Sequence, residues 1–495
     1  MKISVIGDIN IHYIESLCQL FFGAVKFSNS VSDDGTPDVF LELYESDSKV
    51  QVICRFMKSG LTNSFEYIHK KDERLSDLEN RKLAAGNAFY KAGVAYTSKK
   101  LPWGILTGIR PSKLVLEYMN RGFSEKDIFE LLENDYQVFH SNAVLAIQIA
   151  KTEKKYLCFA SDHSASIYIS IPFCPTKCAY CSFVSCASKK LFSLINPYIE
   201  RLCSDIQKTS HLISELGLTV RSLYIGGGTP SILNSSQIKT LMAAIRQYLP
   251  LEQITEFSFE AGRPDTITAE KIKILCESGV TRISVNPQSL SDKVLKTVGR
   301  EHTAEDFYKA YDIVVSSGIP CINTDLIAGL PGDSVEQFQS TVDQIIKLHP
   351  QNVTIHSFCI KNAAALRQNA NEFLSKTTVA ENSVSYSKEA LSLAKYIPYY
   401  IYRQKNTIGN LENVGWCMEG FESAYNILMM EEMHTIFGIG AGAVTKLVSA
   451  DREHIERIFN PKYPYEYLGL SSKKLHNENI DIDTEVKNFY NKYYF

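Results

Sequence analysis

Three cysteines of this chain, Cys174, Cys178 and Cys181, lie in one short loop, separated by three residues and then by two. A structural zinc site usually takes four ligands in two close pairs, and no obvious second pair accompanies these three. A cubane iron–sulfur cluster is held by thiolates, normally four. With three, one iron keeps an open position for another molecule, which makes the cluster a catalytic site. Buried core thiols are the alternative, but Pro172 and Pro175 in the same loop argue against core packing.

The residues around this loop predict the elements that position it. From residue 167 onward, short β-rich runs alternate with longer amphipathic stretches, which is typical of a parallel sheet built from βαβ units. The predicted strands are residues 167–171, 222–225, 256–259, 282–285, 321–327 and 353–358. Functional residues of parallel α/β barrels collect at the carboxyl ends of the strands. The cysteine loop directly follows the first predicted strand.

Further candidate residues lie at the ends of the later strands. They are Gly226, Gly227, Gly228 and Thr229 after the second strand, Glu260 after the third, Gln288 and Arg300 after the fourth, and Asp325 in the fifth. Glycines permit a close approach to a ligand, although a tight structural turn explains them equally well. A carboxylate inside an apolar strand is costly unless it is paired. A ligand hydroxyl, Arg300 or a buried ion pair within the barrel would satisfy Asp325.

The composition sets the class of protein. A length of 495 residues predicts two or three domains, and 45% apolar residues suit a soluble globular protein. A net charge of −3 supplies no basic field for nucleic acid or for an anionic membrane surface. The chain has no apolar stretch long enough to span a bilayer, and its N-terminus lacks the pattern of a signal peptide. We therefore expect a cytoplasmic protein with reduced thiols.

The pattern of elements divides the chain into three regions. We predict an N-terminal α/β domain over residues 1–160, the strand–helix region over 161–366, and a mixed C-terminal region over 367–495. Elements expected outside the strand–helix region are a strand at 3–6, a hairpin of 39–44 and 50–56, and helices at 78–92, 113–120 and 379–395. The charged segment 151–155, followed by 161–164, has the composition of a linker between the first two regions.

The cysteine loop and the segments after the later strands together resemble the radical S-adenosylmethionine (radical SAM) superfamily. Within it they resemble the oxygen-independent coproporphyrinogen III oxidases, also called coproporphyrinogen dehydrogenases. The resemblance implies an α/β fold with a partial (β/α)6 barrel, a [4Fe–4S] cluster on the three cysteines, and SAM on the open iron. It also implies that a radical generated on SAM does the chemistry, so that no side chain is itself catalytic. The residues that it assigns to SAM binding are Tyr168, Tyr180, Gly227, Gly228, Thr229, Glu260, Gln288, Arg300 and Asp325.

Flanking segments at residues 106–111, 402–406 and 409–415 are similar to the HemZ-type branch of that family. The similarity implies oxidative decarboxylation of coproporphyrinogen III to protoporphyrinogen IX in haem biosynthesis. It further implies a C-terminal region that covers the substrate and a flavodoxin- or ferredoxin-type electron donor. The chain departs from the better-studied oxidases at Ser170, where they carry His, and at Phe183, where they carry a further cysteine. Neither position ligates the cluster in that family.

The sequence also suggests residues that bind the substrate, and it leaves two alternative functions open. A tetracarboxylate needs cationic partners, and Arg403 and Lys405 are the candidates, with solvated surface charge as the alternative. His434 either binds haem iron or packs in the core, and we favour packing. A haem-binding or haem-transfer protein on the same barrel and a radical SAM enzyme acting on another tetrapyrrole stay open. The acidic charge balance argues against a nucleic-acid-modifying enzyme. No sequence feature sets the oligomeric state or the role of the N-terminal domain.

Overall fold

The computed structural model describes residues 1–23, 25, 27, 38–58, 61–157, 163–181, 186–359, 370–404, 407–470 and 481–494. The chain forms two compact units. Unit 1 comprises Met1–Lys151, Cys359–Ala370 and Ile401–Glu412, and unit 2 comprises Thr152–Phe358, Asn371–Tyr400 and Asn413–Phe495. Most of the region after residue 367, which the sequence sets apart, therefore contributes to unit 2.

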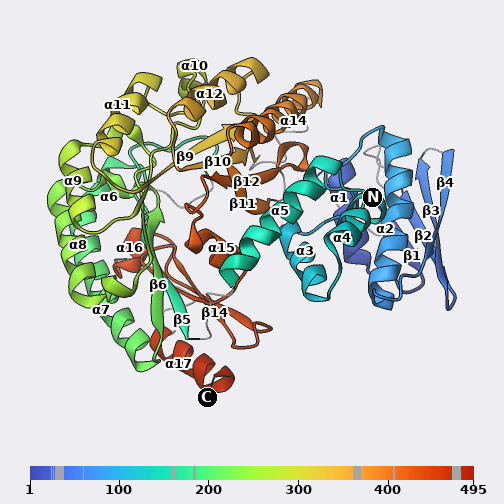
Figure 1. Ribbon diagram of the computed structural model, residues 1–495, viewed down its shortest axis with the longest axis horizontal. Coiled ribbons are helices and arrows are strands. Elements are labelled where there is room, and N and C mark those ends of the chain that lie inside the picture. Colours follow the sequence, from blue (N-terminus) through green and yellow to red (C-terminus); the bar gives the residue numbers. More distant parts are fainter. Residues whose placement is uncertain are drawn as a thin grey trace. The chain divides into compact units, whose positions relative to one another are not determined.

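Unit 1 is built on a four-stranded sheet in the order β1-β2-β3-β4 (Figure 1). Its strands are β1 (Ile3–Ile6), β2 (Asp38–Glu45), β3 (Lys49–Lys58) and β4 (Leu61–Lys70). β1 is parallel to β2, and the other pairs are antiparallel. Phe56 of β3 packs against Phe22 of α1 (Ile11–Phe22) and Phe89 of α2 (Asp77–Thr97), with ring centroids 6.0 and 5.2 Å away. The predicted first strand and hairpin are confirmed.

The remaining α-helices of the N-terminal segment are α3 (Pro111–Asn120), α4 (Glu125–Glu130), which continues into a π-helical turn (Leu131–Asp135), and α5 (His140–Leu157). Pro111 is the first residue of α3, where its missing N–H costs nothing. The linker prediction for residues 151–155 is wrong, because α5 continues through them. Thr152 and Glu153 are buried there while the lysines remain exposed, so the charges mark the solvent side of a helix. Ser161 and Asp162 lie outside the described residues.

Unit 2 contains six parallel strands in consecutive order, as predicted. They are β5 (Ser164–Ile171), β6 (Thr219–Gly227), β7 (Glu256–Glu260), β8 (Arg282–Ser284), β9 (Cys321–Ala328) and β10 (Asn352–Ser357). The intervening helices include α7 (Ile195–Glu215), α8 (Ser235–Tyr248), α9 (Ala269–Glu277), α10 (Asp292–Thr297), α11 (Ala304–Val315) and α12 (Val335–Lys347), and α14 (Ala370–Leu393) follows. In Figure 1, α7, α8, α9 and α11 line the outer face of the curved sheet.

The sheet does not close, and further strands extend both edges into an eleven-stranded order, β11-β12-β10-β9-β8-β7-β6-β5-β13-β14-β15. The additional strands are β11 (Ile397–Arg403), β12 (Glu412–Cys417), β13 (Thr435–Ile439), β14 (Val444–Val448) and β15 (Ile455–Phe459). β13 continues the sheet in parallel beside β5, whereas β12 is antiparallel to β10. Three short helices, α15 (Ala424–Met430), α16 (Pro464–Tyr467) and α17 (Ile482–Tyr493), complete the C-terminal segment.

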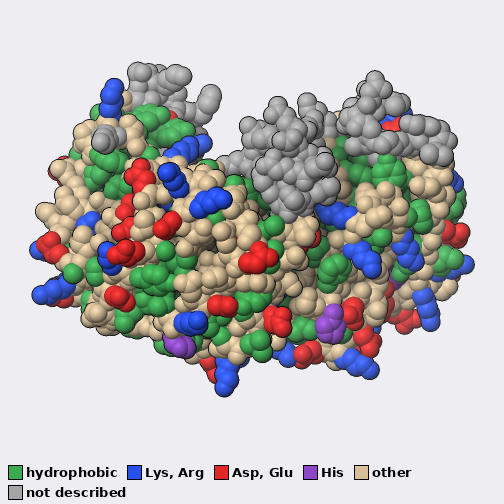
Figure 2. Space-filling model, turned by 90° about the horizontal axis from the view of Figure 1, so that it is seen from above, with side chains coloured by type: hydrophobic (Ala, Val, Ile, Leu, Met, Phe, Trp, Pro, Cys, Tyr) green, Lys and Arg blue, Asp and Glu red, His purple; other side chains and the backbone are tan. Residues whose placement is uncertain are grey.

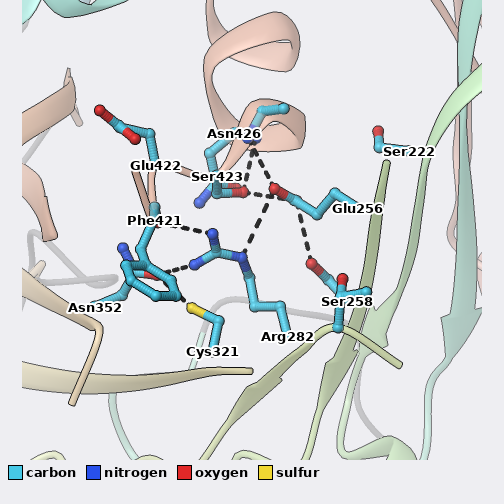
Figure 3. Close-up of polar contacts among 12 residues, drawn as sticks. Ser222, Glu256, Ser258, Arg282, Cys321, Asn352, Phe421, Glu422, Ser423 and Asn426 are labelled. Atoms are coloured by element: carbon cyan, nitrogen blue, oxygen red, sulfur yellow. Dashed lines mark hydrogen bonds and ion pairs between the residues drawn. The ribbon is translucent and has the colours of Figure 1, made fainter. Parts of the chain in front are cut away.

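The amino ends of the central strands are joined by a buried ion pair between Glu256 of β7 and Arg282 of β8 (Figure 3). Their closest charged atoms, Nε and Oε2, are 3.7 Å apart. Arg282 also donates to the Asn352 side chain and, over 2.8 Å, to the Phe421 carbonyl. Glu256 accepts hydrogen bonds from the Ser423 hydroxyl (2.9 Å) and the Ala424 backbone N–H (2.8 Å), at the start of α15. The pair thereby attaches α15 to the base of the sheet.

We predict that Arg282→Met destabilises the protein by about 3–5 kcal/mol, because it leaves Glu256 as a buried charge without its cation. Urea denaturation followed by circular dichroism measures the change in the free energy of unfolding. Lys309→Met is the matched control, since Lys309 pairs with Glu305 on the exposed face of α11, and it leaves that free energy nearly unchanged. Equal effects of the two variants would contradict the central role of the buried pair.

Candidate active site

The cysteine loop leaves β5 at the carboxyl edge of the sheet, as predicted. Cys174 and Cys178 are each 8% exposed, and Cys181 is half-buried. The start of the loop is fixed by backbone hydrogen bonds, from Cys174 N–H to the Cys186 carbonyl (3.2 Å) and from Cys186 N–H to the Pro172 carbonyl (2.8 Å). Burial raises the pKa of Cys174 to about 11, although the hydrogen bond with the Thr229 hydroxyl acts in the opposite direction. Metal binding therefore has to displace a proton from this thiol.

Within the part of the chain that the structure describes, no three His, Cys, Asp or Glu side chains are grouped so as to hold a metal ion. A cubane cluster presents a separate iron to each thiolate, so its three cysteines do not need to converge on one point. Three thiols that are close neighbours in one fixed loop are the donor set that such a cluster takes. The loop residues therefore fit a [4Fe–4S] cluster better than a mononuclear site.

The glycine-rich turn after β6 lies directly against the cysteine loop. Gly227 has a φ of +111°, which strongly favours glycine. A Cβ on Gly228 would lie only 2.5 Å from the Phe173 carbonyl oxygen, so a side chain there cannot be accommodated. Thr229 donates its backbone N–H to the same carbonyl (2.8 Å), and its hydroxyl lies 3.4 Å from the Cys174 sulfur. The turn is thus both a tight structural contact and a neighbour of a predicted cluster ligand.

Arg300 lies behind the loop and is only 6% exposed. Its guanidinium donates to the Tyr180 hydroxyl and to the carbonyls of Gly262 and Asn286, each over 2.7 Å. Burial, followed by the Arg300 charge, lowers the pKa of His302 to about 3, so this imidazole is neutral. The hydrogen-bond partners of Arg300 are hydroxyl, carbonyl and imidazole groups, and no carboxylate of the described residues pairs with it. A buried cation in this state is suited to a carboxylate from a ligand.

The inner face of the sheet carries a stripe of partly accessible polar residues. Most residues of these strands are buried, but several polar side chains are partly exposed. They include Tyr168, Tyr224, Glu260, Asn323, Asp325 and His356. Strand register places Tyr168 beside Tyr224, and Asn323 beside Ser284, which in turn pairs with Glu260. These side chains therefore share one face near the carboxyl edge, where the cysteine loop begins.

The two carboxyl groups of this stripe have different protonation states. Burial, reinforced by the charge of Asp325, raises the pKa of Glu260 to about 7, although the Tyr224 hydroxyl donates to it over 2.5 Å. Burial acts in the same direction on Asp325, but His356, followed by Asn323 and Thr354, outweighs it and lowers the pKa. Asp325 is therefore ionised at neutral pH, while Glu260 is close to its titration midpoint.

Of the partners that the sequence suggested for Asp325, Arg300 does not contact its carboxylate, and the ion pair within the barrel is formed with His356. Asn286 and Asn323 donate their side-chain N–H groups to it over 2.7 and 2.8 Å, and His356 Nε2 lies 3.8 Å away. Arg300 instead contacts the backbone carbonyl of Asn286. Asn286 and His356 are site residues that the sequence analysis missed, because single amide and imidazole side chains carry no spacing signal.

Gln288 adopts a conformation that points to a ligand. Its φ is +66°, a left-handed region that is costly for a residue other than glycine and that recurs at binding sites. Its backbone pairs with β9, through N–H to the Asp325 carbonyl and through its carbonyl to Ile327 N–H, both over 3.0 Å. The side chain is 7% exposed, and its Oε1 accepts no hydrogen bond from the residues that the structure describes. A donor supplied by a ligand would satisfy this atom.

The C-terminal segment adds an aromatic residue that the sequence did not indicate. Tyr425 of α15 stacks on Tyr224, with ring centroids 4.6 Å apart and planes 24° apart. Tyr168 lies 6.0 Å from Tyr224 in a similar stack. The three rings build an apolar wall beside Glu260, and Tyr425 reaches it from a position about two hundred residues later in the chain.

The predicted substrate residues are not both placed. Lys405 lies outside the described residues. Arg403, in unit 1, is buried and donates to the carbonyls of Leu106 (2.7 Å) and Gly108 (3.3 Å). Its backbone N–H also donates to the Ile109 carbonyl over 2.7 Å, so two of the segments singled out in the sequence meet each other. Solvated surface charge, the alternative for Arg403, is therefore wrong.

His434 is buried between two serines. Its Nδ1 lies 3.0 Å from the Ser164 hydroxyl and its Nε2 lies 2.8 Å from the Ser166 hydroxyl. Burial lowers the pKa of His434 to about 3, so the ring is neutral. Both nitrogens are engaged, which agrees with the packing role favoured from the sequence.

The fold and this site define a radical SAM protein, and comparison with known proteins agrees. Residues 168–345 match the model of the radical SAM superfamily, whose members use the [4Fe–4S] cluster and SAM predicted above. The solved structure of coproporphyrinogen III oxidase (HemN) from Escherichia coli shares the fold, with a TM-score of 0.50 and 22% identity over 65% of this chain and 71% of that one.

Two relatives of known classification show which family within the radical SAM superfamily the chain is similar to. The oxygen-independent coproporphyrinogen-III oxidase-like protein HemZ from Bacillus subtilis is 34% identical over 478 residues, covering 94% of both chains. The heme chaperone HemW from Lactococcus lactis is 29% identical over 324 residues, covering 65% of this chain and 79% of that protein. The chain belongs to the family of HemZ-type, oxygen-independent coproporphyrinogen-III oxidase-like radical SAM proteins.

We predict that Glu260 gives the cofactor-free protein a distinct pH dependence. Because its pKa is raised in the folded state, its proton stabilises the fold most at low pH, and this contribution is lost as the pH rises through about 7. Urea denaturation at about pH 5 and about pH 8 should therefore show a larger loss of stability for the wild type than for Glu260→Gln. Glu305→Gln, on an exposed helix face, should follow the wild type. Parallel pH profiles of wild type and Glu260→Gln would contradict the raised pKa.

Proposed function

We propose that this protein catalyses the oxygen-independent oxidative decarboxylation of coproporphyrinogen III to protoporphyrinogen IX in haem biosynthesis. The similarity to HemZ over 94% of both chains carries the proposal. The geometry supports it, because a buried cation without a carboxylate partner and an unsatisfied amide oxygen lie in the region of a three-cysteine loop. These groups suit a ligand that bears a carboxylate and several donors, as SAM does.

Each residue of the site has a separate proposed role in binding the cluster or the ligand. Bound together, a [4Fe–4S] cluster on Cys174, Cys178 and Cys181 and SAM supply the hydrogen-abstracting chemistry that loss of a propionate carboxyl requires. Arg300 binds and orients a ligand carboxylate, and Gln288 accepts from a ligand donor. Asp325 stays ionised and accepts from ligand hydroxyl or amino groups, while Glu260 holds or releases a proton near neutral pH.

Water must be excluded where a carbon radical forms, and the aromatic wall of Tyr168, Tyr224 and Tyr425 contributes to this exclusion. Tyr425 belongs to α15, whose first residues bind Glu256 at the base of the sheet. The C-terminal region therefore contributes to the site itself as well as to any cover over the substrate.

The test is an anaerobic assay of cluster-reconstituted protein with SAM, a reductant, an electron acceptor and coproporphyrinogen III. We expect 5'-deoxyadenosine and a product lacking two carboxyl groups, both detected by liquid chromatography with mass spectrometry. Cys178→Ala should abolish both, because the cluster loses one of its three thiolates. Cleavage of SAM without porphyrinogen conversion would overturn the substrate assignment and favour another tetrapyrrole.

A haem-binding or haem-transfer role is the second candidate, and the similarity to the heme chaperone HemW favours it. Titration of the purified protein with haem, followed by its absorption spectrum, separates the two. Stoichiometric haem binding without conversion of coproporphyrinogen III would support the chaperone role. Conversion without haem binding would support the oxidase.

The proposal includes a flavodoxin- or ferredoxin-type electron donor and a cytoplasmic location. None of the helices in the described part of the chain is long and apolar enough to cross a membrane. On the face shown in Figure 2, acidic and basic side chains are interspersed, and no continuous field of Lys and Arg suggests a nucleic-acid partner.

A further inference from the structure

Arg263 is a second buried arginine beside the cysteine loop, and the roles assigned above leave it unexplained. It follows β7 and is 3% exposed. Burying a guanidinium is costly unless its donors are satisfied. The contacts that satisfy Arg263 show which part of the site it serves.

The guanidinium reaches the middle of the cysteine loop. Its Nη1 donates to the Thr176 hydroxyl over 2.8 Å and lies 3.9 Å from the Cys178 sulfur, within the range of an N–H···S hydrogen bond. Thr176 in turn donates to the Gly299 carbonyl over 3.2 Å. Arg263 therefore restrains the loop at a predicted ligand and at a residue between two predicted ligands.

The charge of Arg263 is fixed by its own carboxylate. Its Nε and Nη2 pair with the two oxygens of Asp265 over 2.9 and 3.0 Å. The positive group thus lies between Cys178 and Asp265. This arrangement differs from that of Arg300, which has no carboxylate partner among the described residues.

We propose that Arg263 is a positioning residue for the iron–sulfur cluster. Arg263 holds Cys178 where its sulfur can bind iron, and its positive charge raises the reduction potential of the cluster. Reduction adds one negative charge to the cluster, and a nearby cation and an N–H···S hydrogen bond stabilise that charge. Asp265 limits the effect, because it partly neutralises the same guanidinium. The inference rests on the cluster in the proposed function and is independent of the substrate.

The test is an EPR-monitored redox titration of the reconstituted protein, without SAM or porphyrinogen. At a fixed potential, Arg263→Met should lower the ratio of reduced to oxidised cluster about tenfold, equivalent to about 59 mV for a one-electron couple. Asp265→Asn should shift the potential in the opposite direction, because it removes a negative charge and keeps Arg263. Arg263→Lys, which keeps the charge but not the planar fork, should lie between Arg263→Met and the wild type.

Thr176→Val separates positioning from charge. It removes the hydroxyl that links Arg263 to Gly299 but leaves the guanidinium in place. We expect a faster loss of iron to a chelator with a potential close to that of the wild type. Iron and sulfide analysis of each variant establishes that the titrated cluster is intact.

Unchanged potential in Arg263→Met with full iron and sulfide content would overturn the electrostatic role, as would shifts of the same sign in Arg263→Met and Asp265→Asn. If Arg263→Met does not fold, Asp265→Asn and Arg263→Lys decide the same question. The potential is measured on any preparation that holds the cluster, whether or not it converts coproporphyrinogen III. Failure of the substrate assignment therefore leaves this result interpretable, whereas a wild-type protein that binds no [4Fe–4S] cluster would overturn both.

Discussion

The constraint on which this structure depends is that the inner face of its parallel sheet is polar and yet largely enclosed. Polar groups withdrawn from water must find partners, since each unsatisfied one costs free energy. At the amino ends of the strands most of this demand is met within the protein. Arg282 and Glu256 bind each other, neighbouring strands and the start of α15, although the Nε of Arg282 has only the 3.7 Å ion pair among the described residues. At the carboxyl edge it is met only in part, and Gln288 keeps an unsatisfied oxygen. The candidate active site therefore lies at the carboxyl edge, where a buried polar group lacks a partner among the described residues.

Two buried arginines lie beside the cysteine loop, and their hydrogen-bond partners indicate different roles for them. Arg263 and Arg300 are both buried, and both donate to residues of the loop. Arg263 carries a bidentate carboxylate of its own, so its charge is balanced before any ligand binds. Arg300 is held by carbonyl and hydroxyl oxygens, which orient it without cancelling its charge. Burial alone does not separate these residues, whereas the identity of the counter-group does. The same distinction applies to Glu260 and Asp325, whose neighbours move their pKa values in opposite directions.

Sequence reasoning succeeded where the determining pattern is local. The cysteine spacing lies within eight residues, and each of the six parallel strands is a short apolar run bounded by turns, so both were predictable. It failed where the partner is distant. The sequence around Glu256 does not indicate that the Ser423 hydroxyl donates a hydrogen bond to it. The sequence around Tyr224 does not indicate that Tyr425 stacks on its ring. The charged segment at the end of α5 was misjudged because a lysine-rich stretch is equally typical of a linker and of the exposed side of a helix. The strands added at the two edges were not predicted, because their β conformation depends on pairing with the central sheet.

The comparison of arginines extends to Arg403, the residue that the HemZ-type resemblance offered for the substrate. Its Nη1 is shared between the carbonyls of Leu106 and Gly108, its backbone pairs with Ile109, and burial lowers its pKa to about 10 while Glu412 opposes that effect. A guanidinium that donates to backbone carbonyls resembles Arg300 in its partners, whereas Arg263 has a bidentate carboxylate. The contacts of Arg403 join its motif to the segment at 106–111, so a structural role accounts for its burial. Binding the carboxylates of a tetrapyrrole requires cations whose charge is uncompensated. Arg300 has no carboxylate partner among the described residues, but in the proposed function it binds the carboxylate of SAM, so the substrate requires other cations.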